Sequence, residues 1–595
     1  VAYLVGDVEI DNLRDYLTKK LPEYMVPSVF VFLDSMPVTP NGKIDRKNLP
    51  EPDNSLFGSE KQISNPITPT EEILKDIWSE VLGVKGIGRN HNFFELGGHS
   101  LLATQVVSRV RDIFSVELPV RTLFELPILS DLSTEIEEKQ RNGKSKLPPI
   151  VPKDAHEKGP LSFAQERLWF LDKLYPQNHF YNILFGISIK GQFDVQILEK
   201  SFNEIIRRHE SLRSSIQTIN GESALVVSWD LNVPVNIKDL QSLSDDEQKK
   251  KVEQITKDEY EKSFDISSAP LIRSCVLKLN SDEHVLLFAM HHIISDGWSM
   301  GIFISELTKL YETFSKGESS PLPELSIHYS DFALWQRKNV DLQSQLSYWK
   351  KGLADLPIIE LQLDFARPTT QSFRGGVERD GLSLAVTDLV KGVASKSGCS
   401  LFMVMLGGFA TLLSRYTNQK DIVIGSPIAN RNYKEIEPLI GFFVNTLALR
   451  CDLSGEPNFL ELLRRIRKTC FDAYANQDVP FEKLVSELQP QRDMSRNPLV
   501  QVNIAFQNMP IELVETVPGL SVNSLDFDPS TVKCDIELHM ADNVDGLKYD
   551  FLYSLDLFEP STIKRMSRHL KKLMESIVNN PEMKLNELSI FDEDE

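Results

Sequence analysis

The sequence lacks any apolar run long enough to cross a membrane. A transmembrane helix needs roughly 18 or more consecutive apolar residues, whereas the longest apolar runs here, such as residues 285–290, have the length of a strand. The first residues, VAYLVGD, also lack the basic and then apolar build of a secretion signal. We therefore expect a protein without a membrane partner, located in the cytoplasm.

Cysteine is scarce, with five in 595 residues and no CxxC pair. Neither a zinc site nor a disulfide framework is expected from such spacing, and we predict no metal site. The thiols are interpreted as ordinary buried or reduced side chains, and none is a candidate nucleophile. They are Cys275, Cys399, Cys451, Cys470 and Cys534.

Concentrated positive charge is also missing. The chain has 65 Lys and Arg against 85 Asp and Glu, a formal net charge of −20. Its densest basic run, residues 249–251, directly follows the acidic residues 245–247. Binding to nucleic acid or to an anionic membrane depends on clustered positive charge, so we expect neither partner.

What is present is enough chain for several domains, since 595 residues exceed one ordinary domain. Residues 1–55 are too few for an independent core and are interpreted as the end of a larger domain. Residues 66–140 show helical periodicity, and residues 141–158, with their prolines, glycine and lack of apolar periodicity, are interpreted as a linker and hinge. From residue 159 onward, strand-like runs alternate with helical patterns, which indicates mixed α/β layers. This last part is long enough for two lobes, divided near residue 335.

Local signals place the first helices of the 66–140 region. Thr68 can cap a helix, Pro69 suits its first position, and Glu71 could complete a capping box. Apolar residues then recur at helical spacing until Gly83. A second helical pattern follows Ser100, and a third lies near residues 128–136, so a small helical bundle is expected.

The first candidate for chemistry is the stretch NFFELGGHSLLATQ, residues 92–105. Its two glycines permit an unusual turn, and Ser100 then lies at or beside a helix start, where free N–H groups and the helix dipole favour an attached anion. A serine there is equally typical of a plain helix cap. The stretch as a whole resembles the phosphopantetheine attachment motif of peptidyl carrier proteins, which form four-helix bundles. The resemblance implies 4'-phosphopantetheine on Ser100, added by a phosphopantetheinyl transferase, and His99 points to ordinary elongation.

The second candidate is MHHIISDGWS, residues 290–299, between an apolar run and a helical pattern at 301–314. Neighbouring side chains at a strand end point to opposite sides, so only one of its two histidines can readily face a given pocket. Two structural histidines would fit the pair alone. The pattern HHxxxDG is nevertheless the signature of the condensation domains of nonribosomal peptide synthetases, two-lobed α/β proteins similar in fold to chloramphenicol acetyltransferase. Further segments match in the family's order: residues 162–169, 208–213, 329–335, 440–446, 477–481 and 492–498.

The resemblance, which spans residues 160–595, implies a role for each residue of this motif. His292 is the pocket-facing histidine, acting as a base or as a positioning group for the acceptor amine, and His291 is structural. Asp296 is expected to be buried, where an unpaired carboxylate is costly, and Arg431 is its implied partner. The N–H of Gly297 could help to stabilise an oxyanion.

Residues 1–55 resemble the C-terminal end of an adenylation domain, a small α+β subdomain, through LPEYMVP at residues 21–27 and PNGKIDR at residues 40–46. Lys43 matches the lysine that contacts the acyl-adenylate in complete enzymes. Because the nucleotide-binding portion is not in this sequence, we expect Lys43 to be vestigial here and predict no ATP-dependent activation by this chain.

The whole pattern is thus interpreted as part of a bacterial nonribosomal peptide synthetase: an adenylation remnant (1–55), a carrier (66–140), a linker (141–158) and a condensation domain with lobes at 159–335 and 336–595. The carrier would hold the donor, with a preference for an L-configured one. The expected partners are the adjoining adenylation and carrier modules and an acceptor carrier. Two alternatives stay open, namely an epimerisation domain of the same fold and a carrier-docking scaffold without activity.

Overall fold

The computed structural model describes only short parts of residues 1–65 and most residues from 66 onward. The described residues are 2–4, 30–32, 66–93, 96, 100–114, 116, 118, 120–140, 148–153, and 159–591 except 220, 340–341, 398, 432, 490–492, 508–518, 526 and 544. The chain divides into two compact units. The first holds residues 1–144 and 391–401, and the second holds residues 145–390 and 402–595.

The N-terminal fragment contributes two short parallel strands, β1 (Ala2–Leu4) and β2 (Phe30–Phe32). Strand β2 falls inside the strand-like stretch SVFVFL, residues 28–33. The other features expected here, including Lys43 and the motifs at residues 21–27 and 40–46, lie outside the described residues. The assignment to an adenylation domain therefore stays a prediction.

The helical region contains α2 (Pro69–Leu82), α3 (Ser100–Phe114), α4 (Val120–Glu125) and α5 (Leu129–Gln140). Thr68 caps α2 by accepting a hydrogen bond from the N–H of Glu71, and Gly83 ends it with a left-handed φ of 69°. The expected capping box is not closed, because the carboxylate of Glu71 accepts from the N–H of Ile67 and pairs with Arg89 at 3.2 Å. Helix α2 packs against α3 and α5, and Trp78 lies fully buried against Phe93.

The first lobe of the second unit is built on a sheet with the order β13-β3-β8-β7-β6. Strands β3 (Asn182–Gly191), β8 (Glu283–His291) and β7 (Ile272–Lys278) are antiparallel neighbours, and β6 (Asn236–Asp239) pairs in parallel with β7. Burial of nearly every residue of β8 explains its unbroken apolar run. The other elements of the lobe are α6 (Phe163–Leu174), α7 (Val195–Arg208), the hairpin β4 (Ser214–Ile219) and β5 (Glu222–Val227), α8 (Asp245–Glu261), α9 (Gly297–Ser315) and α10 (Tyr329–Asn339).

The second lobe is built on a sheet with the order β11-β10-β12-β14-β15-β9. Its strands are β9 (Gly375–Gly381), β10 (Asp421–Ile428), β11 (Asn445–Asp452), β12 (Val502–Phe506), β14 (Ile536–Asn543) and β15 (Gly546–Ser554). Helix α13 (Leu401–Thr417) is buried almost throughout, and α14 (Phe459–Tyr474) packs on β11. Helices α11 (Gln343–Gly352), α15 (Phe481–Leu488) and α16 (Pro560–Asn579) complete the lobe, and α12 (Leu384–Ser397) is assigned to it only up to residue 390.

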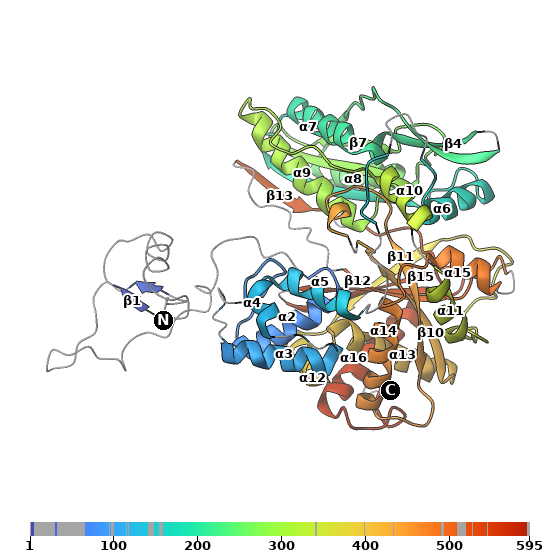
Figure 1. The fold of residues 1–595 in the computed structure, drawn as a ribbon. Helices are drawn as coiled ribbons and strands as arrows, with labels where there is room; N and C mark the ends of the chain where they lie inside the picture. The colour runs from blue at the N-terminus through green and yellow to red at the C-terminus, as the bar shows by residue number, and fades with distance from the viewer. Residues whose placement is uncertain are drawn as a thin grey trace. The chain divides into compact units, whose positions relative to one another are not determined.

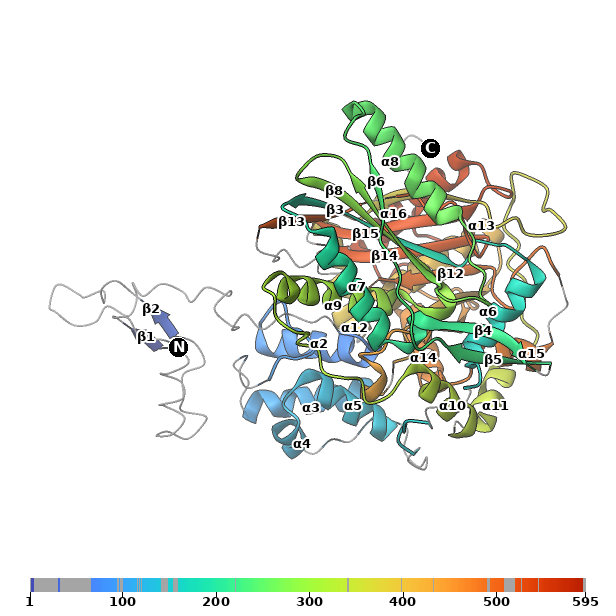
Figure 2. The same ribbon diagram turned by 90° about the horizontal axis from the view of Figure 1, so that it is seen from above.

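One strand departs from the expected division of the lobes near residue 335. Strand β13 (Leu520–Ser524) follows β12 in the chain, yet it pairs antiparallel with β3 in the sheet of the first lobe. Figure 1 shows this orange strand among the green elements of the first lobe, and Figure 2 shows it beside β3 and β8. The later half of the chain thus supplies part of the first sheet, which simple partition of the sequence did not predict.

Part of the expected linker has a fixed place in the second unit. Residues 148–153, here called the linker strap, lie along α10: Trp335 donates its indole N–H to the carbonyl of Pro148 at 2.6 Å, and the N–H of Lys153 donates to Asp331 at 2.9 Å. Ile150 is buried in a cluster with residues that include Trp335 and Phe443. The strap is therefore no hinge, while residues 141–147 and 154–158 lie outside the described residues.

Candidate active site

His292 lies just past the end of β8, in a single 3-10 turn between that strand and α9. Its backbone N–H donates to the carbonyl of Tyr181 at 2.7 Å. Its ring meets the ring of Phe442 edge-on, with centroids 5.0 Å apart. Phe442 comes from the segment before β11, so elements of both lobes fix the position of this histidine.

The hydrogen bond of the His292 ring determines which nitrogen can act as a base. Nδ1 lies 2.9 Å from the carbonyl oxygen of Ser295. A carbonyl can only accept, so Nδ1 carries the proton and the lone pair of the neutral ring is on Nε2. Burial, and then the positive charge of Lys533, lower the pKa of His292 to about 3. The ring is therefore neutral near pH 7.

His291 is used differently from its neighbour. It is 2% exposed, and its Nδ1 accepts a hydrogen bond from the N–H of Ile293 at 3.1 Å. Burial is again the main reason that its pKa falls to about 3. With its Nδ1 lone pair occupied by the backbone, His291 supports the turn that carries His292, as expected for a structural residue.

Asp296 is completely buried and caps α9. Its Oδ1 accepts hydrogen bonds from the N–H of Ser299 at 2.8 Å and from the Ser299 hydroxyl at 2.7 Å, and its Oδ2 accepts from the N–H of Phe443 at 3.0 Å. The guanidinium of Arg431 lies 3.2 Å from Oδ1, with both side chains shielded from solvent. The ion pair that the resemblance implied is thus present, and it joins the HHxxxDG turn to the second lobe.

Arg431 also binds the loop that leads to Phe442. Its Nη1 donates to the carbonyls of Ile436 at 2.8 Å and Leu439 at 2.7 Å, and its Nη2 donates to the Ser299 hydroxyl at 2.9 Å. These bonds spread the guanidinium charge over carbonyl oxygens as well as over one carboxylate, which a buried cation requires. Its many bonds to backbone indicate that Arg431 shapes the loop rather than contacts a substrate.

The segment at Phe442 is held from a third side. The hydroxyl of Tyr329, at the start of α10, donates to the Phe442 carbonyl at 2.5 Å and lies 2.7 Å from the Ser162 hydroxyl. Ser162 caps α6 with a complete capping box. The first turns of α6 and α10 therefore fix the aromatic ring against which His292 rests.

For the remaining predicted site residues, the structure gives the position in the chain's elements or leaves the residue outside the described part. Gly297 is the first residue of α9, and Ser100 is the first residue of α3. Ser100 belongs to the first unit and the histidines to the second. Lys43 and His99 lie outside the described residues.

The sequence pattern includes Ser299 only as part of the motif that indicates the donor subtype, and it gives no role to Lys533. Ser299 lies three residues after Asp296, the spacing of a helix cap and its partner, and this signal could have found it. Lys533 lies just before β14, with its ammonium 5.1 Å from the centroid of the Tyr181 ring. No sequence motif marks this contact, because it joins residues that are far apart in the chain.

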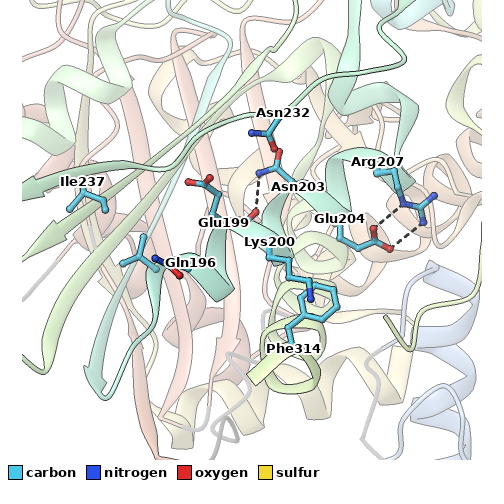
Figure 3. A pocket seen from close by; sticks show the side chains of 10 residues that line it. Gln196, Glu199, Lys200, Asn203, Glu204, Arg207, Asn232, Ile237 and Phe314 are labelled. Atoms are coloured by element: carbon cyan, nitrogen blue, oxygen red, sulfur yellow. Dashed lines mark hydrogen bonds and ion pairs between the residues drawn. The ribbon is translucent and has the colours of Figure 1, made fainter. Parts of the chain in front are cut away.

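A separate surface pocket of about 560 Å³ lies on α7. Its lining includes Lys200, Asn203, Arg207 and Phe314 (Figure 3). Phe314 is near the far end of α9, about 25 Å along the helix from Gly297, so the pocket is distinct from the His292 site. Lys200 lies over the Phe314 ring at 4.1 Å, and Asn203 and Arg207 bond to neighbouring groups.

Two absences apply to the described part of the chain. None of its helices combines the length and apolar character needed to cross a membrane. None of its groups of His, Cys, Asp and Glu could hold a metal ion. The cysteines are all buried and free of disulfides.

Comparison with known families matches both units. A family model described as "Condensation domain" matches residues 155–595, and one described as "Phosphopantetheine attachment site" matches residues 72–136. The chain therefore belongs to the condensation-domain family. With the attachment-site domain ahead of it, the chain is a carrier–condensation segment of the nonribosomal peptide synthetase type.

Relatives among characterised proteins agree with this assignment. A polypeptide of the linear gramicidin synthase from Brevibacillus parabrevis is 43% identical over 589 residues, a match that covers 98% of this chain and 11% of that protein. Bacitracin synthase 3 of Bacillus licheniformis is 38% identical over 600 residues, covering 100% of this chain and 9% of that protein. The chain thus spans about a tenth of the length of each of these relatives.

Solved structures show the same fold. The X-domain from teicoplanin biosynthesis superposes with a TM-score of 0.69 at 23% identity, covering 75% of this chain and 100% of that one. The first condensation domain of the CDA synthetase gives a TM-score of 0.63 at 18% identity, covering 74% and 100% respectively. The two-lobed α/β architecture is therefore confirmed.

Proposed function

We propose that this chain forms peptide bonds, with its carrier presenting a donor acyl thioester and its condensation domain joining that donor to the α-amine of an acceptor. The observation that carries the proposal is the state of His292 within a condensation-family fold. Its ring is neutral, Nδ1 is committed to Ser295, and Nε2 keeps a lone pair. Such a group can accept a hydrogen bond from an attacking amine and so orient its lone pair toward the thioester carbonyl.

The reaction makes a modest demand on that histidine. The amine forms a C–N bond to the thioester carbonyl, the C–S bond breaks, and one proton moves from nitrogen to the departing sulfur. A free α-amino group has a pKa of about 7.7 to 8.0, so part of it is already neutral near pH 7. Nε2 of His292 would accept a hydrogen bond from the amine and orient it for attack, since a ring with a pKa of about 3 stays neutral near pH 7, while Asp296 and Arg431 keep the turn in place.

Ser100 is the proposed attachment point for 4'-phosphopantetheine. It is the first residue of α3, a helix of 15 residues, where N–H groups and the helix dipole favour a phosphodiester. The bound arm supplies the thiol that carries the donor. This position agrees with the attachment-site domain at residues 72–136.

The proposal implies partners outside this chain. An acceptor carrier must bring the amine, a phosphopantetheinyl transferase must modify Ser100, and neighbouring modules must activate the amino acids. Chain order, with the carrier preceding the condensation domain, supports delivery of the donor by this carrier. The motif that includes Trp298 and Ser299 supports a donor of L configuration.

The test of the reaction is a condensation assay with the donor loaded on this chain and an acceptor aminoacyl carrier added separately. We expect His292→Ala to slow dipeptide formation about 100-fold or more, since loss of the correct orientation of a reacting group can cost about that much. The matched control is His328→Ala, a histidine that is 29% exposed. An unaffected His292→Ala variant would favour the docking scaffold without activity.

The epimerase alternative is tested with the same loaded protein. An L-aminoacyl thioester is incubated in deuterated water and its Cα exchange is followed by mass spectrometry. Peptide-bond formation requires no such exchange, so rapid uptake of deuterium without dipeptide would contradict the proposal.

Attachment at Ser100 is tested by intact mass. Wild-type protein treated with a phosphopantetheinyl transferase and coenzyme A is expected to gain one phosphopantetheine, and Ser100→Ala none. The control is Ser108→Ala, a serine later in the same helix. A Ser100→Ala protein that still gains the arm would show that the attachment point is elsewhere.

A further inference from the structure

Lys533 occupies a position beside the reacting histidine that no motif of the sequence identifies. Its ammonium lies 5.1 Å from the centroid of the Tyr181 ring. The carbonyl of Tyr181 accepts the backbone N–H of His292, and its ring lies 6.5 Å from the ring of His291. Lys533 therefore brings a positive charge from the second lobe to the HHxxxDG turn of the first.

The backbone around Lys533 is held on both sides. The N–H of Lys533 donates to Glu537 Oε1 at 2.8 Å, and its carbonyl accepts from the side-chain amide of Asn497. Two residues earlier, the Thr531 hydroxyl lies 2.6 Å from the hydroxyl of Tyr260 in α8. These contacts fix the backbone from which the lysine side chain extends, as expected of a group that serves a site.

The ammonium has no carboxylate bound to it among the described residues. Glu537 is the acidic residue whose charge acts on Lys533, but its Oε1 accepts the N–H groups of Lys533 and Cys534, and its Oε2 lies 3.1 Å from His539 Nε2. Arg167, the other charged neighbour, is itself a cation. Burial lowers the pKa of Lys533, with Glu537 opposing that effect.

Lys533 is half-buried, and a cation held partly out of solvent without an ion-pair partner carries a cost. Proteins accept such a cost where a charge must meet a group that becomes negative during a reaction. In the proposed reaction, the oxygen of the donor carbonyl becomes negative when the amine attacks. Nε2 of His292 is an acceptor and faces the amine, so a different group must stabilise that oxygen.

We propose that Lys533 is a catalytic residue that binds the donor carbonyl oxygen and stabilises the negative charge that forms on it. This inference rests on the proposed peptide-bond formation and adds a residue to it. No proton leaves the lysine: the electron pair of the C=O bond moves to oxygen on attack and returns as the C–S bond breaks, and the amine proton, which Nε2 of His292 accepts as a hydrogen bond, transfers to the departing sulfur. The N–H of Gly297 could donate to the same oxygen from the first lobe.

The test compares single-turnover rates of wild-type protein with those of Lys533→Met, which keeps the length and removes the charge. Loss of one such donor costs about 100-fold in rate, and we expect that loss in kcat, with the KM for the acceptor carrier within about twofold. Lys533→Arg keeps the cation and should recover part of the rate. The matched control is Lys468→Met, since Lys468 is 78% exposed.

The outcomes separate this inference from the proposed function. A wild-type protein that makes no dipeptide would contradict the function itself. A wild-type protein that does, together with a folded Lys533→Met variant within threefold of its rate, would overturn only the role of Lys533, as would a loss confined to the acceptor KM. If Lys533→Met does not fold, Lys533→Gln replaces it, and a folded Gln variant at the wild-type rate gives the same negative answer.

Discussion

The carbonyl of Ser295 makes Nε2 the basic nitrogen of His292, and the low pKa of this ring, about 3, keeps it neutral over the working range. The fall in rate at low pH should therefore come from protonation of the acceptor amine, which must be neutral to react. We expect kcat/KM to rise with pH up to the pKa of the acceptor amine, about 7.7 to 8.0 for a free α-amino group.

This pH dependence is checked by measuring kcat/KM between about pH 5 and 9 with acceptors whose amines differ in basicity. The pH at which the rate falls should shift with the pKa of the acceptor amine. A fall that stays at one pH for every acceptor would belong to the enzyme and would contradict a neutral His292.

The Asp296–Arg431 pair is expected to matter for stability rather than for proton transfer. Asp296→Ala leaves the buried guanidinium of Arg431 without its counter-charge, which typically costs about 3 to 5 kcal/mol. The control is Asp421→Ala, which breaks the half-exposed pair with Arg450 and should cost no more than about 1 kcal/mol. Urea denaturation measures both, and equal losses would show that burial of the first pair has no special weight.

At this scale, sequence reasoning reached the residues inside one motif or linked by the family pattern: His291, His292, Asp296 and Arg431. Their spacing along the chain carries the information. Lys533 could not be found in that way, since its contact with Tyr181 depends on how the two lobes pack and not on any local pattern.

Among the elements, the linker strap shows how a segment without periodicity can still be ordered. Residues 148–153 have no apolar repeat, yet Ile150 is 6% exposed while Val151, its neighbour, is 63% exposed. The strap adds Ile150 to the cluster that contains Phe443, whose N–H binds Asp296. Through Phe443 and Asp296, the strap therefore supports the turn that carries His292.

Ile150→Ala tests that support. Removing a buried isoleucine side chain costs about 2 to 5 kcal/mol, so we expect a loss in that range in the unfolding free energy of the second unit. Val151→Ala is the control and should change it by less than about 0.5 kcal/mol. Similar small effects from both variants would show that the strap adds nothing to the fold.

Element boundaries set by neighbouring residues could be predicted from the sequence, whereas those set by residues far away in the chain could not. The ends of α2 were predicted because Thr68 and Gly83 act on adjacent residues. The capping box was wrong in part, because Arg89, a residue from another segment, pairs with the glutamate that should have closed it. The packed strap could not be predicted, since its hydrogen bonds go to Asp331 and Trp335 in α10.

Across the second unit, the two lobes share a site and also share a strand. His292 comes from the first lobe, and Phe442, Arg431 and Lys533 come from the second. Strand β13 runs from the second lobe into the first sheet, where Leu520 pairs with Gly191 of β3. The two-lobed fold was predicted, but this exchange was not, because an edge strand of five residues has no sequence signal for its partner.

Gly191 is the position where a side chain would most disturb the pairing of β13 with β3. Its φ is +128°, and a Cβ added there would lie 2.1 Å from the carbonyl oxygen of Gly519. Gly191→Ala should therefore strain the start of the β13–β3 pairing, by roughly 1 to 3 kcal/mol. We expect amide hydrogens of β13 to exchange about tenfold faster or more, because an opening equilibrium changes tenfold for every 1.4 kcal/mol.

Hydrogen exchange followed by mass spectrometry measures this effect, with β14 and β15 as the internal reference within the same protein. The matched control is Gly352→Ala, where an added Cβ meets no atom within 4 Å. Since β13 joins the lobes that together hold His292, Gly191→Ala should also slow dipeptide formation without changing the carrier. Unchanged exchange in β13 would mean that the strand is held by its other pairs with β3, and that Gly191 does not control how the lobes are joined.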